Sequence, residues 1–216
     1  MVPTMASYAD LANRPVLSQP TYEAGRPIEV VAREFGLEPA SVIKLASNEN
    51  PLGPSPLGLA AARRALEVAH LYPDGGCTFL REKLAVHWGL TPGHFIVGNG
   101  SNEVMLQLLQ AFGGPGRCAL SFAPTYSMYP EYARDAMTEW VTGHRAEDFA
   151  LDLDAARALV LERKPSLVLL PSPNNPTGTA LPPEAVTVLC EAAASYEPGG
   201  LVVVDEAYGE FRRAGT

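Results

Sequence analysis

Hydrophobic residues occur in short runs along the second half of the chain, and helical stretches lie between these runs. We predict strands for the runs at 95–98, 118–122, 139–142, 167–172 and 201–205. Most runs are continuous rather than alternating, which is typical of parallel strands that are covered on both faces. The intervening helices are predicted to begin near Ser101, Asp154 and Pro183. The pattern therefore predicts an α/β fold whose binding residues gather at the carboxyl ends of the strands.

Two helices are predicted before the first of these runs. Ser55 and Pro56 provide an N-cap and a first-turn proline for a helix that continues to residue 70. Thr78 is expected to cap the second helix, and Gly89 to end it. One face of this second helix is expected to be buried, because apolar residues recur there every four positions, at Leu80, Leu84 and Trp88.

Residues 1–50 differ from the rest of the chain, since they are broken by prolines and show little periodicity. We therefore predict an N-terminal arm over residues 1–50 and one domain over residues 51–216. No apolar run approaches the roughly 20 residues needed to cross a bilayer. The N-terminus also lacks the basic start and apolar middle of a secretory signal. These features predict a soluble, cytoplasmic protein.

Charge and cysteine content narrow the classes of partner. The chain has 16 basic and 24 acidic residues and a net charge of −8, which disfavours nucleic acid and anionic membranes as partners. The three cysteines, Cys77, Cys118 and Cys190, are far apart, so we expect reduced thiols that are buried as small hydrophobic side chains. Neither the cysteines nor the four histidines have the spacing of metal ligands, and no metal site is predicted.

The stretch GNGSNE at 98–103 joins a predicted strand to a predicted helix. Its glycines allow a tight turn, and the free amides at the start of the helix attract an anion such as phosphate. The alternative is a plain turn in which Ser101 is only an N-cap. The stretch is not a dinucleotide fingerprint, because Glu103 stands where the third glycine would be, and no lysine follows a glycine as in a Walker A loop.

Asp205 ends the apolar run at 201–205, where burial of its carboxylate is costly unless a cation or several donors face it. A cationic ring nitrogen would meet that requirement, and so would backbone amides that the carboxylate caps. A magnesium ligand of the Walker B type is a third interpretation. This last one lacks its partner phosphate loop.

Two further motifs follow predicted strands. PSPNNPTG at 171–178 places Asn174 and Asn175 in a proline-stiffened turn at the carboxyl edge of the sheet, where both amides can donate to an anionic oxygen. FAPTYSMYPEY carries tyrosines three residues apart, at Tyr126, Tyr129 and Tyr132. A tyrosine ring at a strand end can cover a flat ligand, although such tyrosines are more often half-buried packing residues.

Six motifs in order, KLASNENPLGPSP, LYPDGG, VGNGSNEV, FAPTYSMYP, LPSPNNPTG and VVVDEAYGEF, resemble the fold-type I pyridoxal-phosphate aminotransferases of class I/II, most closely the histidinol-phosphate aminotransferase branch. The resemblance runs from Thr21 to Phe211. It implies a three-layer large domain with a mostly parallel sheet, of which residues 51–216 form a part that is incomplete at the C-terminus. It also implies a homodimer when full length.

The resemblance implies an activity as well. The full-length form is expected to transfer an amino group from L-histidinol phosphate, or a related amino acid, to 2-oxoglutarate by means of pyridoxal 5′-phosphate. Aromatic amino-acid aminotransferases and a threonine-phosphate decarboxylase share almost all of these motifs and remain alternatives. The motifs represent the amino-terminal portion of the family.

The resemblance gives roles to the residues around the cofactor ring. Asp205 would pair with the protonated pyridine nitrogen and keep the ring an electron sink. Asn175 and Tyr208 would hydrogen-bond the phenolic oxygen of the ring. Tyr126 would stack on the ring's face.

Four other residues are given roles at the edges of this site. Ser101 and Asn102, with the adjacent helix amides, would bind the 5′-phosphate. Tyr72 resembles a tyrosine that reaches across a two-fold dimer to the neighbour's cofactor phosphate. Tyr22 resembles an N-terminal tyrosine near the substrate side chain, in a looser match.

The family's lysine, which bonds covalently to the cofactor, lies downstream of the segment that matches DEAY. Lys44, Lys83 and Lys164 all precede that segment and match no lysine motif. We therefore assign no catalytic residue in this chain and expect a truncated form that is inactive alone and either poorly soluble or partner-dependent, with strand 95–98 unpaired. The alternatives are a non-catalytic chain that binds pyridoxal phosphate or a partner, and a nucleotide-binding switch that uses Asp205 on magnesium.

Overall fold

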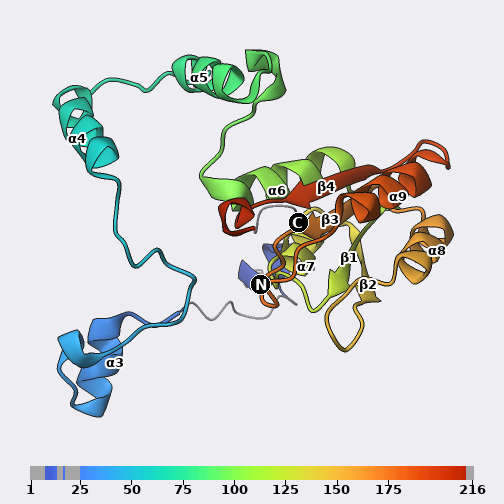
Figure 1. Ribbon diagram of the computed structural model, residues 1–216, viewed down its shortest axis with the longest axis horizontal. Coiled ribbons are helices and arrows are strands. Elements are labelled where there is room, and N and C mark those ends of the chain that lie inside the picture. Colours follow the sequence, from blue (N-terminus) through green and yellow to red (C-terminus); the bar gives the residue numbers. More distant parts are fainter. Residues whose placement is uncertain (1–7, 14–16, 18–24, 213–216) are drawn as a thin grey trace, which may run out of the picture. The chain divides into compact units, whose positions relative to one another are not determined.

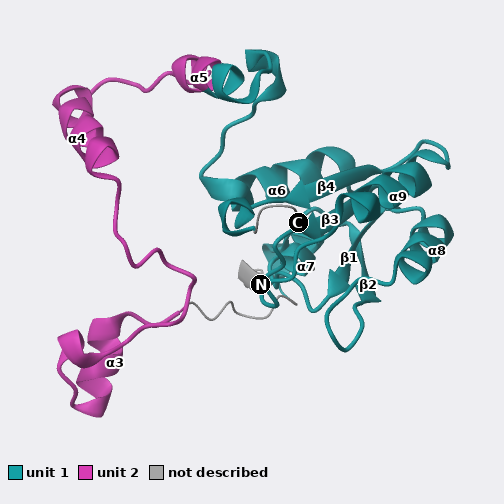
Figure 2. Cartoon of the chain, in the orientation of Figure 1, with its two compact units in different colours: residues 1–19, 84–216 teal, residues 20–83 magenta. Residues whose placement is uncertain are grey.

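The computed structural model describes residues 8–13, 17 and 25–212 (Figure 1). The chain forms two compact units, one of residues Pro20–Lys83 and one of residues Met1–Gln19 with Leu84–Thr216 (Figure 2). The division predicted from the sequence, an arm over 1–50 and a domain over 51–216, stays a prediction.

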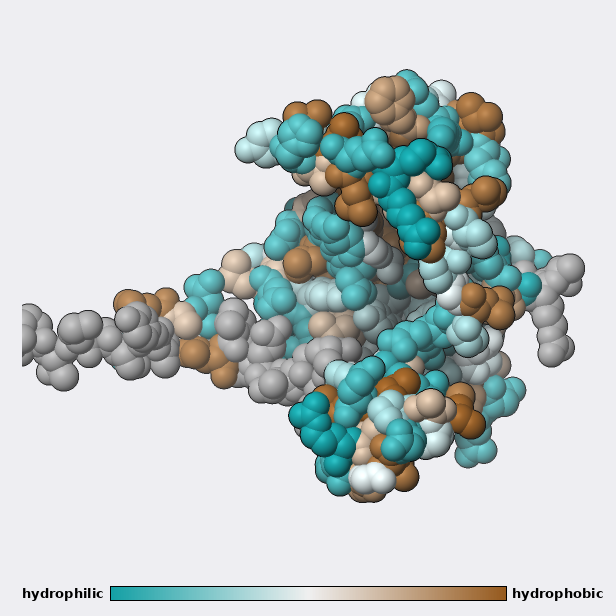
Figure 3. Space-filling view, turned by 90° about the vertical axis from the view of Figure 1, so that its left-hand side faces the viewer, coloured by the Kyte–Doolittle hydropathy of each residue, from teal (hydrophilic) through white to brown (hydrophobic). Residues whose placement is uncertain are grey.

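The unit Pro20–Lys83 consists of short helices joined by extended segments. It contains α3 (Ile28–Phe35), α4 (Pro56–Ala65), the first half of α5 (Thr78–Trp88) and 3₁₀ helices at Pro39–Ser41 and Leu66–Val68. The predicted cap of α4 is confirmed, because Ser55 Oγ accepts a hydrogen bond from the Gly58 amide at 3.3 Å. Among the described residues of this unit, Ala32 alone is buried. Hydrophobic residues, brown in Figure 3, are accordingly present on the surface beside hydrophilic ones.

Helix α5 ends at Gly89 as predicted, with φ +65° at the glycine. Its predicted cap was wrong, since Thr78 is the first helical residue and Asp74 caps it instead, accepting from the Thr78 amide at 2.6 Å. The predicted buried face was also wrong. Leu80 is 46% exposed and Trp88 64% exposed, because a helix's apolar stripe becomes buried only where another element covers it.

The second unit contains the sheet. Its strands are β1 (Cys118–Ala123), β2 (Glu139–His144), β3 (Leu167–Pro171) and β4 (Leu201–Asp205). Its helices are α1 (Tyr8–Leu11), the end of α5, α6 (Gly100–Phe112), α7 (Tyr129–Asp135), α8 (Leu153–Arg163), α9 (Pro183–Ala194) and 3₁₀ helices at Pro92–His94 and Gly209–Phe211. The strands lie in the order β2-β1-β3-β4, and all neighbours are parallel. The predicted α/β fold with a parallel sheet is confirmed.

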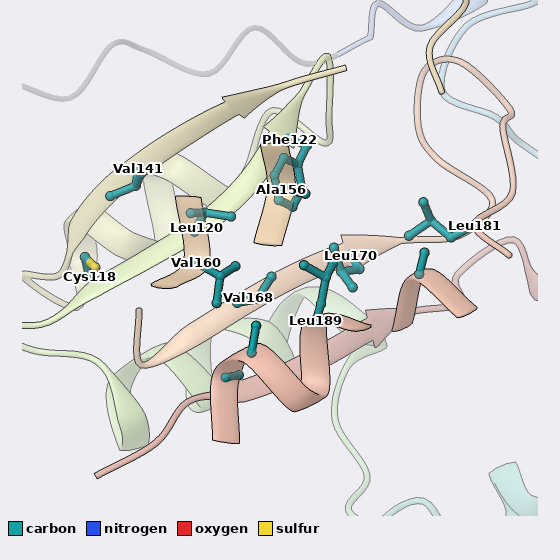
Figure 4. Close-up of a cluster of buried hydrophobic side chains, with 13 residues drawn as sticks. Cys118, Leu120, Phe122, Val141, Ala156, Val160, Val168, Leu170, Leu181 and Leu189 are labelled. Atoms are coloured by element: carbon teal, nitrogen blue, oxygen red, sulfur yellow. The ribbon is translucent and has the colours of Figure 1, made fainter. Parts of the chain in front are cut away.

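Both faces of this sheet are covered, which explains the continuous apolar runs. Leu120, Val168 and Leu170 point to one face and pack with α8 and α9 (Figure 4). Ala119, Leu167, Leu169 and their neighbours form the other cluster, with residues of α6 and α7. Successive residues of one strand therefore contribute to different clusters, as the two-residue period of a strand requires.

The strand predicted at 95–98 was wrong. Phe95 has extended backbone angles, φ −117° and ψ 133°, but the segment belongs to none of the four described strands. Extended conformation becomes a strand only when a neighbour supplies the hydrogen-bonded ladder. Ile96 is 69% exposed, so the apolar run at 95–98 is not buried either.

The cysteines follow the prediction only in part. Cys118 is buried and Cys77 is partly buried, but Cys190 is exposed on α9, so the expectation of three buried thiols was wrong. Within residues 8–13, 17 and 25–212, no group of three His, Cys, Asp or Glu side chains is placed to hold a metal ion. None of the helices in those ranges has the length and apolar character needed to span a membrane.

Candidate active site

A cavity of about 240 Å³ lies at the carboxyl ends of β3 and β4. It is lined by Gly100, Ser101, Asn102, Tyr126, Pro171, Pro173, Asn175, Asp205, Ala207 and Tyr208. Six residues to which the sequence assigned a role are thus brought to one cavity: Ser101, Asn102, Tyr126, Asn175, Asp205 and Tyr208. They come from the start of α6, from the loops that follow β1, β3 and β4, and from the end of β4.

Strand register places the acid and the asparagine turn together. Pro171 of β3 lies opposite Asp205 of β4, and the Ser172 amide donates to the Asp205 carbonyl at 2.9 Å. The turn that begins at Ser172 therefore starts beside the carboxylate. The far end of the turn is also held beside its start, because the Leu181 amide donates to Ser172 Oγ at 2.9 Å.

The Asp205 side chain is 9% exposed and has a donor on each oxygen. Oδ2 accepts from the Tyr129 hydroxyl at 2.7 Å, and Oδ1 accepts from the Ala207 amide at 3.0 Å. One backbone amide is thus capped, as one interpretation of the sequence expected. An ionised carboxylate offers about four acceptor sites, so these two bonds leave capacity toward the cavity. A cationic group there would offset the desolvation of the carboxylate.

The amino end of α6 forms another wall of the cavity. The residue before the helix is Asn99, so the alternative interpretation, in which Ser101 is only an N-cap, was wrong. Glu103 reaches back instead, accepting from the Asn99 amide at 2.5 Å and from Asn99 Nδ2 at 2.8 Å. The bond from the Asn99 amide is the main reason why the pKa of Glu103 lies below its ordinary value. Ser101 and Asn102 lie in the first turn, where backbone amides favour an anion.

Tyr126 follows β1 and is half-buried at the cavity. Its hydroxyl donates to Asn102 Oδ1 at 3.2 Å, and its ring meets the Tyr129 ring edge-to-face at 5.4 Å between centroids. The two contacts together restrict the ring. A fixed aromatic face of this kind can cover a planar ligand.

The two asparagines of the proline-stiffened turn have different surroundings. Asn174 is 2% exposed, and its Nδ2 donates to the Pro124 carbonyl at 3.0 Å and to Thr177 Oγ1 at 2.7 Å. Asn175 is half-buried and lines the cavity. The expectation that both amides face the edge of the sheet was therefore wrong for Asn174, which holds the turn together.

Two predicted residues fall outside the unit that contains the cavity. Tyr72 belongs to the unit Pro20–Lys83 and is fully exposed. Tyr22 lies outside the described residues. Lys164 belongs to the unit that contains the sheet and is absent from the cavity lining, whereas Lys44, in the other unit, pairs with Glu49 at 2.8 Å.

Tyr129 is the residue that sequence reasoning missed. Its hydroxyl bonds Asp205, yet the sequence offered only its spacing of three from Tyr126, which is equally typical of packing in the first turn of a helix. A contact between residues 76 positions apart leaves no local signal. Knowledge of the strand order was needed to find it.

A larger cavity of about 760 Å³ lies at the opposite, amino ends of the strands. Its lining includes Phe112 at the end of α6, Arg163 at the end of α8 and Ala194 at the end of α9. Helix carboxyl ends carry partial negative charge, which disfavours anions. None of the predicted site residues lines it, so the smaller cavity is the better candidate site.

The donor set of the smaller cavity fits pyridoxal 5′-phosphate. It offers a buried carboxylate for a ring cation, an amide and a phenol for an anionic oxygen, an aromatic face, and helix amides for a phosphate. Each group of the cofactor thus has residues of matching chemistry in the lining. Asp205, the charged side chain of that lining, would face the cationic ring nitrogen.

Fold and site together define a class of protein. A model of the aminotransferase class I and II family matches residues 40–215, and the chain belongs to that family. Membership of this family indicates pyridoxal phosphate as the cofactor.

Among its relatives, the chain is 52% identical to a histidinol-phosphate aminotransferase of Thermobifida fusca, over 80% of this chain and 47% of the relative. It is 50% identical to that of Frankia casuarinae, over 81% and 46%. Its structure is similar to the histidinol-phosphate aminotransferase of Sinorhizobium meliloti in complex with pyridoxal-5′-phosphate, with TM-score 0.76, 27% identity, and coverage of 92% and 51%. An aspartate aminotransferase of Thermus thermophilus gives TM-score 0.76 at 26% identity, covering 90% and 53%. The chain spans about half the length of these relatives.

Proposed function

We propose that the chain binds pyridoxal 5′-phosphate and that the whole protein transfers an amino group from L-histidinol phosphate, or a related amino acid, to 2-oxoglutarate. The observation that carries this proposal is the buried carboxylate of Asp205, which lines one cavity with the amino end of α6. Identities of 50% and 52% to histidinol-phosphate aminotransferases support the choice of substrate class.

The residues present would hold the cofactor by its separate groups. Asp205 would pair with the ring nitrogen, and Asn175 and Tyr208 would donate to the phenolic oxygen. Tyr126 would cover one face of the ring. When bound, the cofactor supplies an electron sink for negative charge that develops at the α-carbon of an amino acid.

Asp205 and the first turn of α6 carry charges that are complementary to those of such a ligand. The buried Asp205 carboxylate favours a proton on a facing ring nitrogen, because opposite charges in a desolvated site stabilise each other. At the other end, the first-turn amides at Ser101 and Asn102 favour a phosphate dianion. The ligand would therefore be oriented by charge as well as by shape.

A second copy of the protein is proposed to complete the site. Tyr72 is fully exposed. Its unit also exposes large apolar side chains: Ile43 (85%), Leu45 (90%), Leu52 (91%) and Leu57 (84%). An unpartnered apolar surface of this kind is typical of an interface. The proposed homodimer would cover it and bring Tyr72 to the partner's cofactor phosphate.

One observation favours a second candidate function for the 216 residues by themselves. Lys44, Lys83 and Lys164 are the lysines of the sequence; all three precede the segment that matches DEAY and match no lysine motif of the family, and Lys164 does not line the cavity. The chain alone would then bind the cofactor without a covalent bond and without turnover.

Two assays test these proposals. In the first, amino transfer to 2-oxoglutarate is measured with L-histidinol phosphate, phenylalanine and threonine phosphate, both for the 216-residue chain and for any longer product of its reading frame. The proposal expects activity of the longer product with L-histidinol phosphate and none of the shorter chain. Activity with phenylalanine alone would contradict the proposed substrate.

In the second assay, binding of pyridoxal phosphate to the chain is measured for wild type, Asp205→Asn and Asp154→Asn. The Asp154 variant is the matched control, because it removes the same charge from an exposed site in the first turn of α8. Asp205→Asn should weaken binding and Asp154→Asn should not. Equal binding by all three proteins would exclude Asp205 as the partner of the ring.

A further inference from the structure

Tyr129 connects the two sides of the cavity without lining it. It is fully buried at the start of α7, and its hydroxyl donates to Asp205 Oδ2 at 2.7 Å. Its ring meets the Tyr126 ring edge-to-face at 5.4 Å and the Trp140 ring at 6.4 Å, tilted by 43°. One side chain therefore contacts both the acid and the aromatic residue that the proposed cofactor would touch.

The surroundings of Tyr129 fix its position. The cluster around it includes Met105, Leu109 and Leu169, from α6 and β3, each at most 5% exposed. A ring packed on several sides has little rotational freedom, so its hydroxyl is held at one place. The carboxylate that accepts from this hydroxyl is held with it.

The direction of this hydrogen bond is fixed. Burial raises the pKa of the Tyr129 phenol far above its ordinary value, and the charge of Asp205 raises it further. The phenol therefore stays protonated and can only donate to the carboxylate. It occupies one acceptor site of the carboxylate and leaves others available toward the cavity. A buried tyrosine that merely satisfied its own hydroxyl could have used a backbone carbonyl, as Tyr196 does with Pro165 at 2.6 Å.

We infer that Tyr129 is a positioning residue: its hydrogen bond holds the Asp205 carboxylate aimed into the cavity, and thereby makes the site select ligands whose ring carries a protonated nitrogen. This inference rests on the proposed function and deepens it. It assigns selectivity to a residue that does not touch the ligand.

The test compares two ligands that differ at one ring atom. Pyridoxamine 5′-phosphate is used because it has no aldehyde and cannot bond to surface lysines, and the second ligand is its analogue with C–H in place of the ring nitrogen. Binding of both to the full 216-residue chain is measured by titration calorimetry for wild type, Tyr129→Phe, Asp205→Asn and the double variant. Tyr196→Phe is the matched control, since it removes a phenolic hydrogen bond outside the cavity lining.

We expect Tyr129→Phe to weaken binding of pyridoxamine phosphate roughly tenfold, as for loss of a hydrogen bond to a charged group. Binding of the C–H analogue should not change. In the Asp205→Asn background the same substitution should have little further effect, because the two side chains act as one unit. Tyr196→Phe should leave the affinities for both ligands as in wild type.

Each contrary result has a separate meaning. If wild type prefers pyridoxamine phosphate and Tyr129→Phe keeps the full preference, the inference is wrong while the proposed function stands. If Tyr129→Phe weakens both ligands equally, the residue only supports packing and the inference is again wrong. If wild type binds neither ligand, the proposed cofactor and the inference both fail.

A second measurement needs no variant at position 129. The Tyr129 hydroxyl proton, shielded from exchange by burial, should give a downfield proton resonance in the wild-type chain. It should shift when pyridoxamine phosphate binds and move upfield in Asp205→Asn. A resonance that is the same in both proteins would overturn the inference even if Tyr129→Phe does not fold.

Discussion

Replacing Gly143 with alanine is expected to destabilise the sheet, although glycine is ordinarily unfavourable in a strand. Gly143 lies in β2 directly opposite Phe122 of β1, and the Phe122 ring covers it. A Cβ at this position would lie 2.4 Å from Phe122 Cδ1 and 3.0 Å from Leu159 Cδ2. Carbon atoms pack at about 3.5–4.0 Å, so the ring would have to move by roughly 1 Å.

The magnitude follows from opposing contributions. Alanine reduces the freedom of the unfolded chain, which stabilises by about 0.4–1 kcal/mol, and the methyl group adds up to about 0.8 kcal/mol by burial. Overpacking a tight core costs about 1–3 kcal/mol, and the upper part of that range applies because Phe122 is 2% exposed and is packed in the cluster with residues of α8 and α9. The expected net loss is about 1 kcal/mol.

The assay is urea unfolding followed by circular dichroism, with thermal melting as a second measure. A loss of about 1 kcal/mol corresponds to a fall of roughly 2–4 °C in Tm for a chain of this size. Gly93→Ala serves as the control, because the nearest atom to its new Cβ is Thr91 Oγ1 at 3.9 Å. Phe122→Leu should relieve part of the cost of Gly143→Ala, as coupled neighbours do. A Gly143→Ala protein as stable as wild type would refute the reasoning.

Two further predictions concern the asparagine turn and the start of α5. Asn174→Ala should lower the free energy of unfolding in urea by about 1–3 kcal/mol, because it removes two hydrogen bonds of a buried side chain. Asn175→Ala should leave the free energy of unfolding within about 0.5 kcal/mol of wild type and weaken binding of pyridoxamine phosphate. Equal stability of the two variants would contradict the different roles of the two asparagines. The pKa of Asp74 lies below its ordinary value of 3.8, chiefly because of the bond from the Thr78 amide. The ionised Asp74 carboxylate therefore stabilises the start of α5 above pH 3.8, and this stabilisation is lost as the pH falls through the lower pKa of the folded state. Amide exchange at Thr78 should accelerate over that pH range in wild type. In Asp74→Asn it should follow only the intrinsic pH dependence of amide exchange.

The fold could be predicted from the sequence where the signal is local. The runs at 118–122, 139–142, 167–172 and 201–205 became strands within two residues of their predicted bounds. The continuous apolar sequence of β1 and β3 matches their burial on both faces. The run at 95–98 is also apolar but is not a strand. Composition alone does not report whether a pairing neighbour is present.

Capping was predicted less well than the helices themselves. Ser55 caps α4, but Asp74 and Glu103 take the places expected of Thr78 and Ser101. Carboxylates several residues away can reach the same amides as an adjacent hydroxyl. The residue type at one position therefore does not decide which side chain bonds the first turn.

The candidate site was predictable residue by residue where a motif followed a strand. The cavity includes Asn175, Tyr126 and Asp205, as the motifs indicated. The separate orientation of Asn174 and the bond from Tyr129 to Asp205 depend on contacts with residues 50 and 76 positions away. Such contacts are set by strand order and register, which the sequence does not display.

The cavity walls come from residues as far apart as Gly100 and Tyr208, contributed by a helix start, three loops and the ends of two strands. No contiguous peptide contains enough of them to recognise a ligand, so an unfolded chain has nothing for a ligand to hold. Occupancy would therefore raise the melting temperature in proportion to the logarithm of free ligand concentration. The dependence of the melting temperature on ligand concentration thus reports whether the chain has assembled the cavity at the ends of β3 and β4.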